Sequence, residues 1–150
     1  MSIWQGLLGK LGLGHASDRR PLRVFLLDDD VLRHEWFARR FARDELDTAV
    51  DPAEAVELLS SNTYDAIFLD HDLLPEHYNS GEHDDERTGY AVAAWLAARP
   101  GAQSGATIVV HTRNADGALR MVELMRREGL QAEHVPFPYL SPKIKNYWGR

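Results

Sequence analysis

The stretches 22-LRVFLLDDD-30, 64-YDAIFLDHD-72 and 107-TIVVHTRN-114 decide the fold of this 150-residue chain. Each is a largely apolar run that ends in charged or polar side chains and precedes a segment with helical character. Buried strands that alternate with helices are typical of an open, parallel α/β sheet. Ligands bind such sheets beyond the carboxyl ends of the strands, where the strand order reverses. The polar ends of these three stretches are therefore expected to meet in one crevice.

The remaining sequence continues the same alternation. Asp51 followed by Pro52 indicates the start of a helix, as does Thr88, while Gly129 indicates a helix end. Crossovers that contain a helix imply parallel strands. The sequence thus predicts an α/β fold with a five-stranded, parallel, doubly wound sheet in a three-layer sandwich. The expected strands are Leu22–Leu27, Leu46–Val50, Tyr64–Leu69, Thr107–Val110 and Ala132–Val135.

Composition limits the class of protein. A length of 150 residues suits one domain with a single core. The net charge of −6 disfavours wholesale binding to nucleic acid or to an anionic membrane. The absence of cysteine excludes disulfides and thiolate metal sites and fits a cytoplasmic location. No apolar stretch approaches the roughly 20 residues of a membrane span, so no membrane partner is expected.

The ends of the chain differ from its centre. Residues 1–21 are expected to form a leader with a short apolar helix, either docked on the domain, mobile, or binding a partner or a membrane surface. Residues 22–137 form the predicted domain. Residues 138–150 form a tail that mixes aromatic and basic side chains. That composition suits a helix packed across a sheet edge, and also a platform for single-stranded nucleic acid.

In its order and spacing of polar residues, the chain resembles the receiver domain of response regulators over about Leu22–Phe137. The resemblance implies the flavodoxin-like or receiver-like form of the sheet. It matches Asp28 and Asp29 to the acidic pair that binds Mg²⁺ in that family. Asp70 matches the aspartate that accepts the phosphoryl group, and Thr112 matches the hydroxyl residue after the fourth strand.

The chain also departs from ordinary receivers. Val135-Pro136 stands where that family carries a Lys-Pro pair whose lysine contacts the phosphoryl group. His71 and His111 flank the matched aspartate and threonine, and extra residues follow Asp72. This pattern is similar to the atypical cyclic-phosphate processing receiver domains. That resemblance implies hydrolysis of cyclic phosphates in place of phosphorelay.

Several carboxylates in one crevice repel one another, and a divalent cation relieves that repulsion. We expect Asp28, Asp29 and Asp70 to be the metal ligands, with Asp30 capping the next helix. Oxygen ligands suit Mg²⁺, Ca²⁺ or Mn²⁺, and a nearby imidazole shifts the preference toward Mn²⁺. The expected cofactor is therefore Mg²⁺ or Mn²⁺.

His71 and His111 are candidate proton-transfer groups because an imidazole gains or loses a proton near neutral pH. Together with Asp70 they form the predicted catalytic set. Thr112 and Arg113 are the candidate phosphate-binding residues, because arginine presents a fixed fork of donors to phosphate oxygens. The alternatives are structural histidines and a surface ion pair for Arg113. Asn114 is expected to cap a helix.

The acidic, histidine-rich segment 76–87 is a lid, a second metal site or a solvated loop. Two main functions remain open. The first is a metal-dependent phosphoesterase that acts on a cyclic nucleotide or on an RNA end carrying a cyclic phosphate. The second is a stand-alone response-regulator receiver that is phosphorylated at Asp70 and signals by protein contacts. A degenerate receiver fold that serves only protein contacts is the third, and fold alone does not decide between them.

Overall fold

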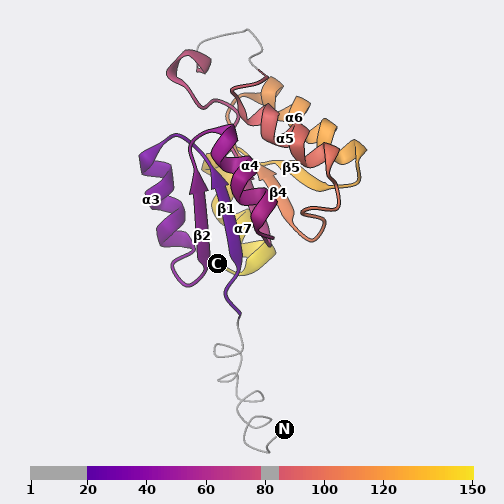
Figure 1. Cartoon of the computed structure of the whole chain (residues 1–150). Helices are drawn as coiled ribbons and strands as arrows, with labels where there is room; N and C mark the ends of the chain where they lie inside the picture. The colour runs from indigo at the N-terminus through magenta and orange to yellow at the C-terminus, as the bar shows by residue number, and fades with distance from the viewer. Residues whose placement is uncertain (1–19, 79–84) are drawn as a thin grey trace, which may run out of the picture.

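The computed structural model describes residues 20–78 and 85–150, so most of the predicted leader, at residues 1–19, lies outside the described residues. One sheet of five parallel strands has the order β2-β1-β3-β4-β5 (Figure 1). This is the doubly wound arrangement of flavodoxin-like folds, and it confirms the predicted fold class. The strands are β1 (Arg23–Leu27), β2 (Glu45–Ala49), β3 (Ala66–Leu69), β4 (Thr107–Val110) and β5 (Gln131–His134).

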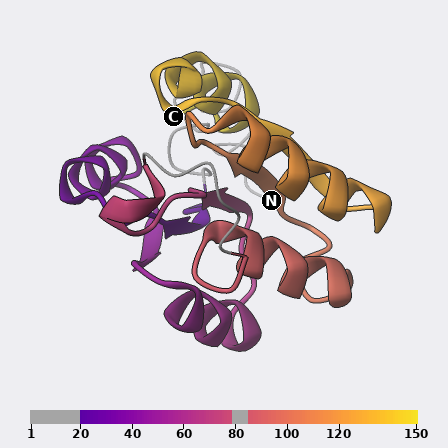
Figure 2. The ribbon, with the colours of Figure 1, turned by 90° about the horizontal axis from the view of Figure 1, so that it is seen from above.

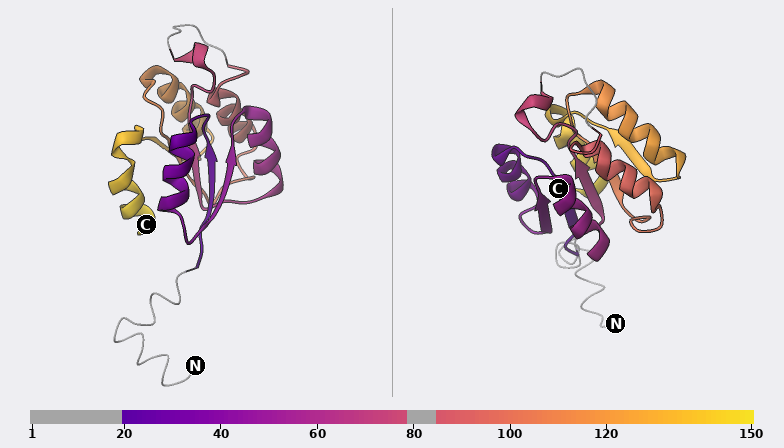
Figure 3. Two further views of the ribbon diagram at one scale, coloured as in Figure 1. Left: turned by 90° about the vertical axis from the view of Figure 1, so that its left-hand side faces the viewer. Right: turned by 45° about the horizontal axis from the view of Figure 1, so that its top comes forward.

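Helices cover both faces of the sheet (Figure 2). Helices α3 and α7 lie side by side on one face, as the left view of Figure 3 shows. Helices α4, α5 and α6 pack on the other face. The helices are α3 (Val31–Arg40), α4 (Pro52–Ser61), α5 (Gly89–Ala98), α6 (Ala115–Arg127) and α7 (Leu140–Trp148), with short 3₁₀ turns η1 (Pro75–His77) and η2 (Phe137–Tyr139).

Side-chain caps fix where the helices begin. Asp30 accepts hydrogen bonds from the backbone of Leu32 and Arg33, which confirms its predicted capping role. Asp51, Thr88 and Asn114 cap α4, α5 and α6 in the same way, as the sequence predicted. Each cap satisfies a backbone N–H that the helix itself leaves without a partner. The caps therefore hold α3 and α6 to start just beyond the ends of β1 and β4.

The core has two halves, because successive side chains of a strand point to opposite faces of the sheet. In β1, Phe25 and Leu27 face α4, α5 and α6, whereas Val24 and Leu26 face α3 and α7. All four side chains are fully buried. Burial on both faces explains why the central strands β1, β3 and β4 read as largely apolar runs.

The C-terminal tail contributes to one half of this core. Leu140 and Ile144 of α7 are fully buried against the sheet. The Trp148 ring lies 5.6 Å from the Phe68 ring of β3. The prediction of a packed helix is thus confirmed for 140–148, with the correction that α7 lies on a face of the sheet and not across its edge. A helix reaches the face because the apolar side chains of the tail recur at helical spacing.

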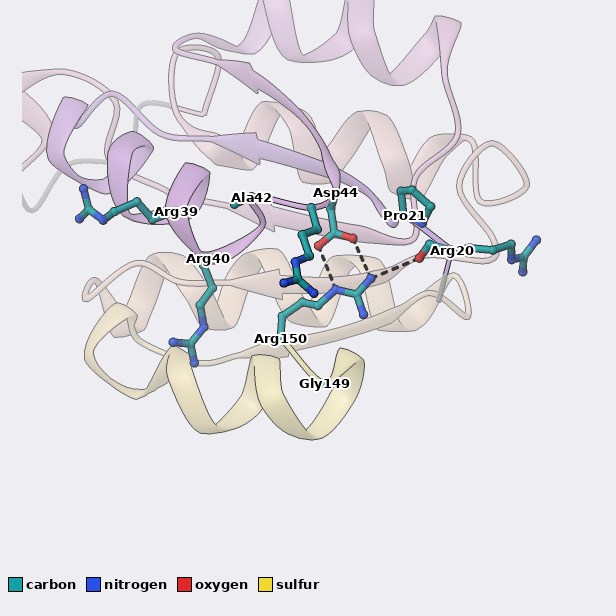
Figure 4. Close-up of a pocket in the computed structure, with 9 residues that line it drawn as sticks. Arg20, Pro21, Arg39, Arg40, Ala42, Asp44, Gly149 and Arg150 are labelled. Carbon is teal, nitrogen blue, oxygen red and sulfur yellow. Dashed lines mark hydrogen bonds and ion pairs between the residues drawn. The ribbon is translucent and has the colours of Figure 1, made fainter. Parts of the chain in front are cut away.

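Asp44 joins three segments at the end of the sheet where β1 begins (Figure 4). One carboxylate oxygen accepts hydrogen bonds from the Leu22 backbone at 2.8 Å and from Arg150 Nη2 at 2.7 Å. The other accepts from Arg150 Nε at 2.9 Å. This bidentate pair ties the end of the chain to the start of β1. Among residues 20–78 and 85–150, no helix is both long and apolar enough to cross a membrane.

Candidate functional site

Strand order reverses between β1 and β3, and the predicted site residues gather at the carboxyl ends of these strands and of β4. Asp28 follows β1 and is fully buried, and Asp70 follows β3 and is 3% exposed. His111, directly after β4, is 1% exposed. Asp28, Asp70 and His111 each place a potential ligand atom within 4.8 Å of the others. The structure therefore brings these three side chains together where the strand order reverses, as the sequence predicted.

The Asp28 carboxylate is the centre of the cluster. Its Oδ2 accepts hydrogen bonds from His111 Nε2 and Arg33 Nε, both at 2.7 Å. Its Oδ1 accepts from Arg33 Nη2 at 2.9 Å and from the Asp30 backbone at 2.8 Å. Burial alone would raise the pKa of Asp28, but the bonds from His111 and Arg33 outweigh it and lower that pKa to about 2. Asp28 is thus a permanently charged group at neutral pH.

Asp70 lies in a different electrostatic environment. Burial raises its pKa to about 7, with a further rise from the Asp28 charge, while His111 and Arg33 act in the opposite direction. Its Oδ1 accepts from the His71 backbone at 2.9 Å, and its Oδ2 accepts from Arg33 Nη2 at 3.2 Å. Asp28 and Asp70 therefore form a carboxylate pair whose pKa values are driven apart, an arrangement typical of functional sites.

Gly89, the first residue of α5, makes this geometry possible. Its backbone N–H donates to the His71 carbonyl at 2.9 Å. A Cβ atom at position 89 would lie 1.8 Å from the Asp70 carbonyl oxygen. Only a residue without a side chain allows α5 to begin so close to the strand end.

Arg33 is the site residue that sequence reasoning missed. It lies in the first turn of α3, and its guanidinium forms ion pairs with Asp28, Asp29, Asp30 and Asp70. The sequence did contain one signal for this role, a basic residue in the first turn of the helix that follows the acidic end of β1. A side chain at that position points back toward the turn before the helix.

Asp29 has a partner of its own. Its Oδ1 accepts a hydrogen bond from the Tyr78 hydroxyl at 2.7 Å. Tyr78 follows η1 in the segment after β3, and its ring lies at the rim of the crevice. Burial and the bond to Asp29 raise the pKa of Tyr78, so the hydroxyl remains a donor. Asp29 is therefore near the cluster but outside the buried group of Asp28, Asp70 and His111.

The two candidate histidines have different surroundings. The His111 ring lines the crevice. The His71 ring does not, since its Nδ1 lies 2.8 Å from Asp72 Oδ1 and its carbons lie against Gly117 of α6. A Cβ atom at position 117 would lie 2.6 Å from the His71 ring. The structure therefore places His71 beside α6, away from the group of three, because a glycine leaves room for it there.

Thr112 and Arg113 both line the crevice, as predicted for phosphate binding. The Thr112 hydroxyl oxygen accepts from the Asn114 backbone at 3.1 Å, which leaves its proton available to a ligand. The crevice, measured over the described residues, has a volume of about 100 Å³. Ligand pockets usually enclose about 300–1,000 Å³. A cavity of this size accommodates a group such as a phosphoryl and leaves the rest of a larger substrate outside.

The donor set fits a divalent cation in its chemistry. Carboxylate oxygens are the ligands that Mg²⁺ and Mn²⁺ prefer, and an imidazole nitrogen is compatible with Mn²⁺. The oxygens that would bind the ion are the same ones that Arg33 contacts. A divalent cation therefore fits at this cluster once the Arg33 guanidinium has moved away from these oxygens.

The profile of the family described as the cyclic-phosphate processing receiver domain matches residues 23–127. The chain belongs to this family. The matched region runs from β1 through α6 and includes Asp28, Asp29, Asp70 and His111. No curated protein sequence matches the chain.

Solved structures of receiver domains share the fold. A response regulator from Burkholderia pseudomallei, with a phosphorylated aspartic acid, calcium ion and citrate, aligns with a TM-score of 0.61 and 19% identity over 85% of this chain and 66% of that protein. TrrA from Thermotoga maritima, in complex with Mg²⁺-BeF, gives 0.58 and 21% over 83% and 97%. A CheY-like receiver domain from Methylobacillus flagellatus gives 0.60 and 17% over 85% and 98%. These likenesses confirm the receiver fold.

Proposed function

We propose that the protein is a phosphoesterase that opens a cyclic phosphate on a nucleotide or at an RNA end. The observation that supports this most directly is the buried pair of Asp28 and His111, whose carboxylate and Nε2 lie 2.7 Å apart beside Asp70. A histidine oriented by a carboxylate is the arrangement of a proton-transfer group. The description of the family as processing cyclic phosphates agrees with that chemistry.

The reaction adds water across one P–O bond of the ring. Water forms a new bond to phosphorus, one ester P–O bond breaks, and a phosphomonoester results. The departing oxygen takes its proton from the His111 ring, which lines the crevice and which Asp28 orients through the bond to its Nε2. The attacking water releases its proton to solvent, and the His111 ring takes one proton back from solvent, so the ring ends each turnover in the state in which it began.

Hydrogen-bond donors around the crevice would hold the phosphate. Arg113 and the Thr112 hydroxyl line it at the end of β4, and both donate to phosphate oxygens. A divalent cation held by Asp28, Asp29 and Asp70 would add Lewis-acid polarisation of a phosphoryl oxygen. The small cavity admits the phosphate and leaves the nucleoside outside. We assign no step to His71, since its ring lies against α6.

The alternative is a receiver that accepts a phosphoryl group on Asp70. The likeness to the Burkholderia pseudomallei protein, whose structure contains a phosphorylated aspartic acid, favours this reading. Two features of the chain oppose it. A pKa of Asp70 raised to about 7 leaves less of the charged, nucleophilic carboxylate at neutral pH. Val135, 5% exposed in the core, stands where ordinary receivers carry their lysine.

The experiment is turnover of nucleoside 2′,3′-cyclic phosphates and of RNA with a 2′,3′-cyclic end, with Mg²⁺ or Mn²⁺ added. We expect a phosphomonoester product, and a loss of about 10²–10⁴-fold in His111→Ala, because that is the usual contribution of one acid or base. His134→Ala is the matched control. The His134 ring contacts the Thr112 carbonyl at 2.7 Å and no carboxylate of the cluster.

Circular dichroism and unfolding midpoints will show that both variants fold. If the metal-loaded protein turns over none of these substrates, the phosphoesterase is excluded. If both histidine variants retain wild-type rates, the role of His111 is excluded even though the activity exists.

A further inference from the structure

One nitrogen of Arg33 lies where the three carboxylates predicted to bind metal come together. Arg33 Nη2 is 2.9 Å from Asp28 Oδ1 and 3.2 Å from Asp70 Oδ2. The same atom is 4.0 Å from Asp29 Oδ1. A cation at this point would contact all three aspartates at once. The chain therefore already carries a positive group at the position that a divalent ion would take.

The guanidinium also occupies the bonding capacity of the carboxylates. Both oxygens of Asp28 accept two hydrogen bonds each, and Arg33 donates one of each pair. A carboxylate oxygen offers about two lone pairs, so Asp28 has no free site for a metal while Arg33 is bound. Metal binding and the Arg33 contact are mutually exclusive at Asp28.

The Arg33 side chain has room to adopt a second orientation. Its side chain is 23% exposed, in contrast to the fully buried Asp28, and it lines the crevice together with Arg113. Its backbone is fixed in the first turn of α3, and its guanidinium is held by ion pairs with the aspartates of the cluster. A long side chain at the mouth of a cavity can turn its charged head toward an anion there, because its stem bends freely. Such an anion would contact the guanidinium groups of Arg33 and Arg113. Position 135, where ordinary receivers carry a lysine, is Val and offers no charge.

We propose that Arg33 is an exchangeable internal cation. Without a divalent metal it neutralises Asp28 and Asp70, and when the metal takes these carboxylates it transfers its hydrogen bonds to the substrate phosphate. This inference rests on the proposed function for the identity of the substrate, although the exchange itself requires only a phosphate. Arg33 then supplies, from α3, the positive contact to phosphate that Val135 cannot make.

The exchange couples the two ligands. A metal that displaces Arg33 prepares the guanidinium for phosphate, and a phosphate that attracts Arg33 uncovers the carboxylates for metal. Such a coupling is reciprocal by thermodynamic necessity, and couplings of about 5–150-fold in affinity are typical. Mn²⁺ and phosphate should therefore bind the wild-type protein with positive cooperativity.

The test is titration calorimetry of Mn²⁺ alone, and of Mn²⁺ in the presence of inorganic phosphate, on the full chain. Wild type should bind Mn²⁺ weakly, and phosphate should tighten it by at least about 5-fold. Arg33→Met, which keeps the stem and removes the charge, should bind Mn²⁺ at least tenfold more tightly than wild type, and phosphate should no longer tighten it. Arg33→Lys, with the charge retained, should lie between the two.

Arg23→Met is the control, because Arg23 pairs with Glu45 at the surface and begins β1, at the end of the sheet far from the crevice. It should match wild type in both titrations. Equal Mn²⁺ affinity in wild type, Arg33→Met and Arg33→Lys would overturn the inference, as would phosphate coupling that survives in Arg33→Met. Because no cyclic substrate is used, a protein that shows the exchange but hydrolyses nothing would refute the proposed function and leave the exchange standing.

Discussion

Replacing Gly89 by alanine tests how tightly the start of α5 is held against the end of β3. The added Cβ would lie 1.8 Å from the Asp70 carbonyl oxygen and 3.1 Å from a methyl carbon of Met121. The first contact is with backbone, which cannot rotate away, so the two segments must separate by roughly 1.6 Å to reach an ordinary contact distance of about 3.4 Å. That movement also strains the bond from the Gly89 N–H to the His71 carbonyl.

Inserting a methyl group into a packed site typically costs about 1–3 kcal/mol, and a clash with backbone belongs at the upper end of that range. The higher helix propensity of alanine relative to glycine offsets at most about 1 kcal/mol of this cost. We expect Gly89→Ala to lower the free energy of unfolding by about 2–3 kcal/mol, and the melting temperature by about 4–12 °C for a chain of this length.

Urea unfolding followed by circular dichroism measures the effect. Gly105→Ala is the matched control, since no atom lies within 4 Å of its added Cβ, and it should change stability by less than about 0.5 kcal/mol. If Gly89→Ala unfolds at the same urea concentration as Gly105→Ala, the close approach of α5 to Asp70 is wrong.

Two further predictions concern Asp70. Because burial raises its pKa from 3.8 to about 7, the stability it contributes is complete below pH 4 and is lost as the pH rises through 7. In metal-free buffer, Asp70→Asn should therefore gain stability relative to wild type between pH 4 and 8, and a parallel pH dependence of the two proteins would contradict this. Small phosphodonors should label Asp70 poorly in wild type, because Val135 replaces the lysine that contacts the phosphoryl group, and a robust, long-lived acyl phosphate in mass spectrometry would favour the receiver alternative.

The fold could be predicted because its signals are local. Strand Thr107–Val110 has the predicted limits, and the caps at Asp30, Asp51 and Thr88 lie where the sequence indicated. Apolar runs and capping residues act within a few positions of the chain, so one sequence contains the whole pattern. The convergence of the strand ends then follows from the topology of a parallel sheet.

The details of the site could not be predicted, because they depend on which way long side chains turn. Arg33 reaches four aspartates from α3, and no periodic pattern marks a charged residue in a first helical turn as part of a site. The position of His71 depends on Gly117, which is 46 residues further along the chain, in α6. Contacts between distant segments require coordinates, and they separate the surroundings of two histidines that look equivalent in sequence.

The hydrogen bond between Tyr78 and Asp29 couples the position of the segment after β3 to ligand binding at the carboxylate cluster. A ligand that takes the Asp29 oxygen must release the Tyr78 hydroxyl, which is 2.7 Å away. Linkage requires the reverse as well, so anything that draws Tyr78 from the rim makes Asp29 more available to a cation. Hydrogen exchange at the backbone of η1 should thus accelerate when a cation binds, giving a readout of site occupancy from a segment that contributes no carboxylate to it.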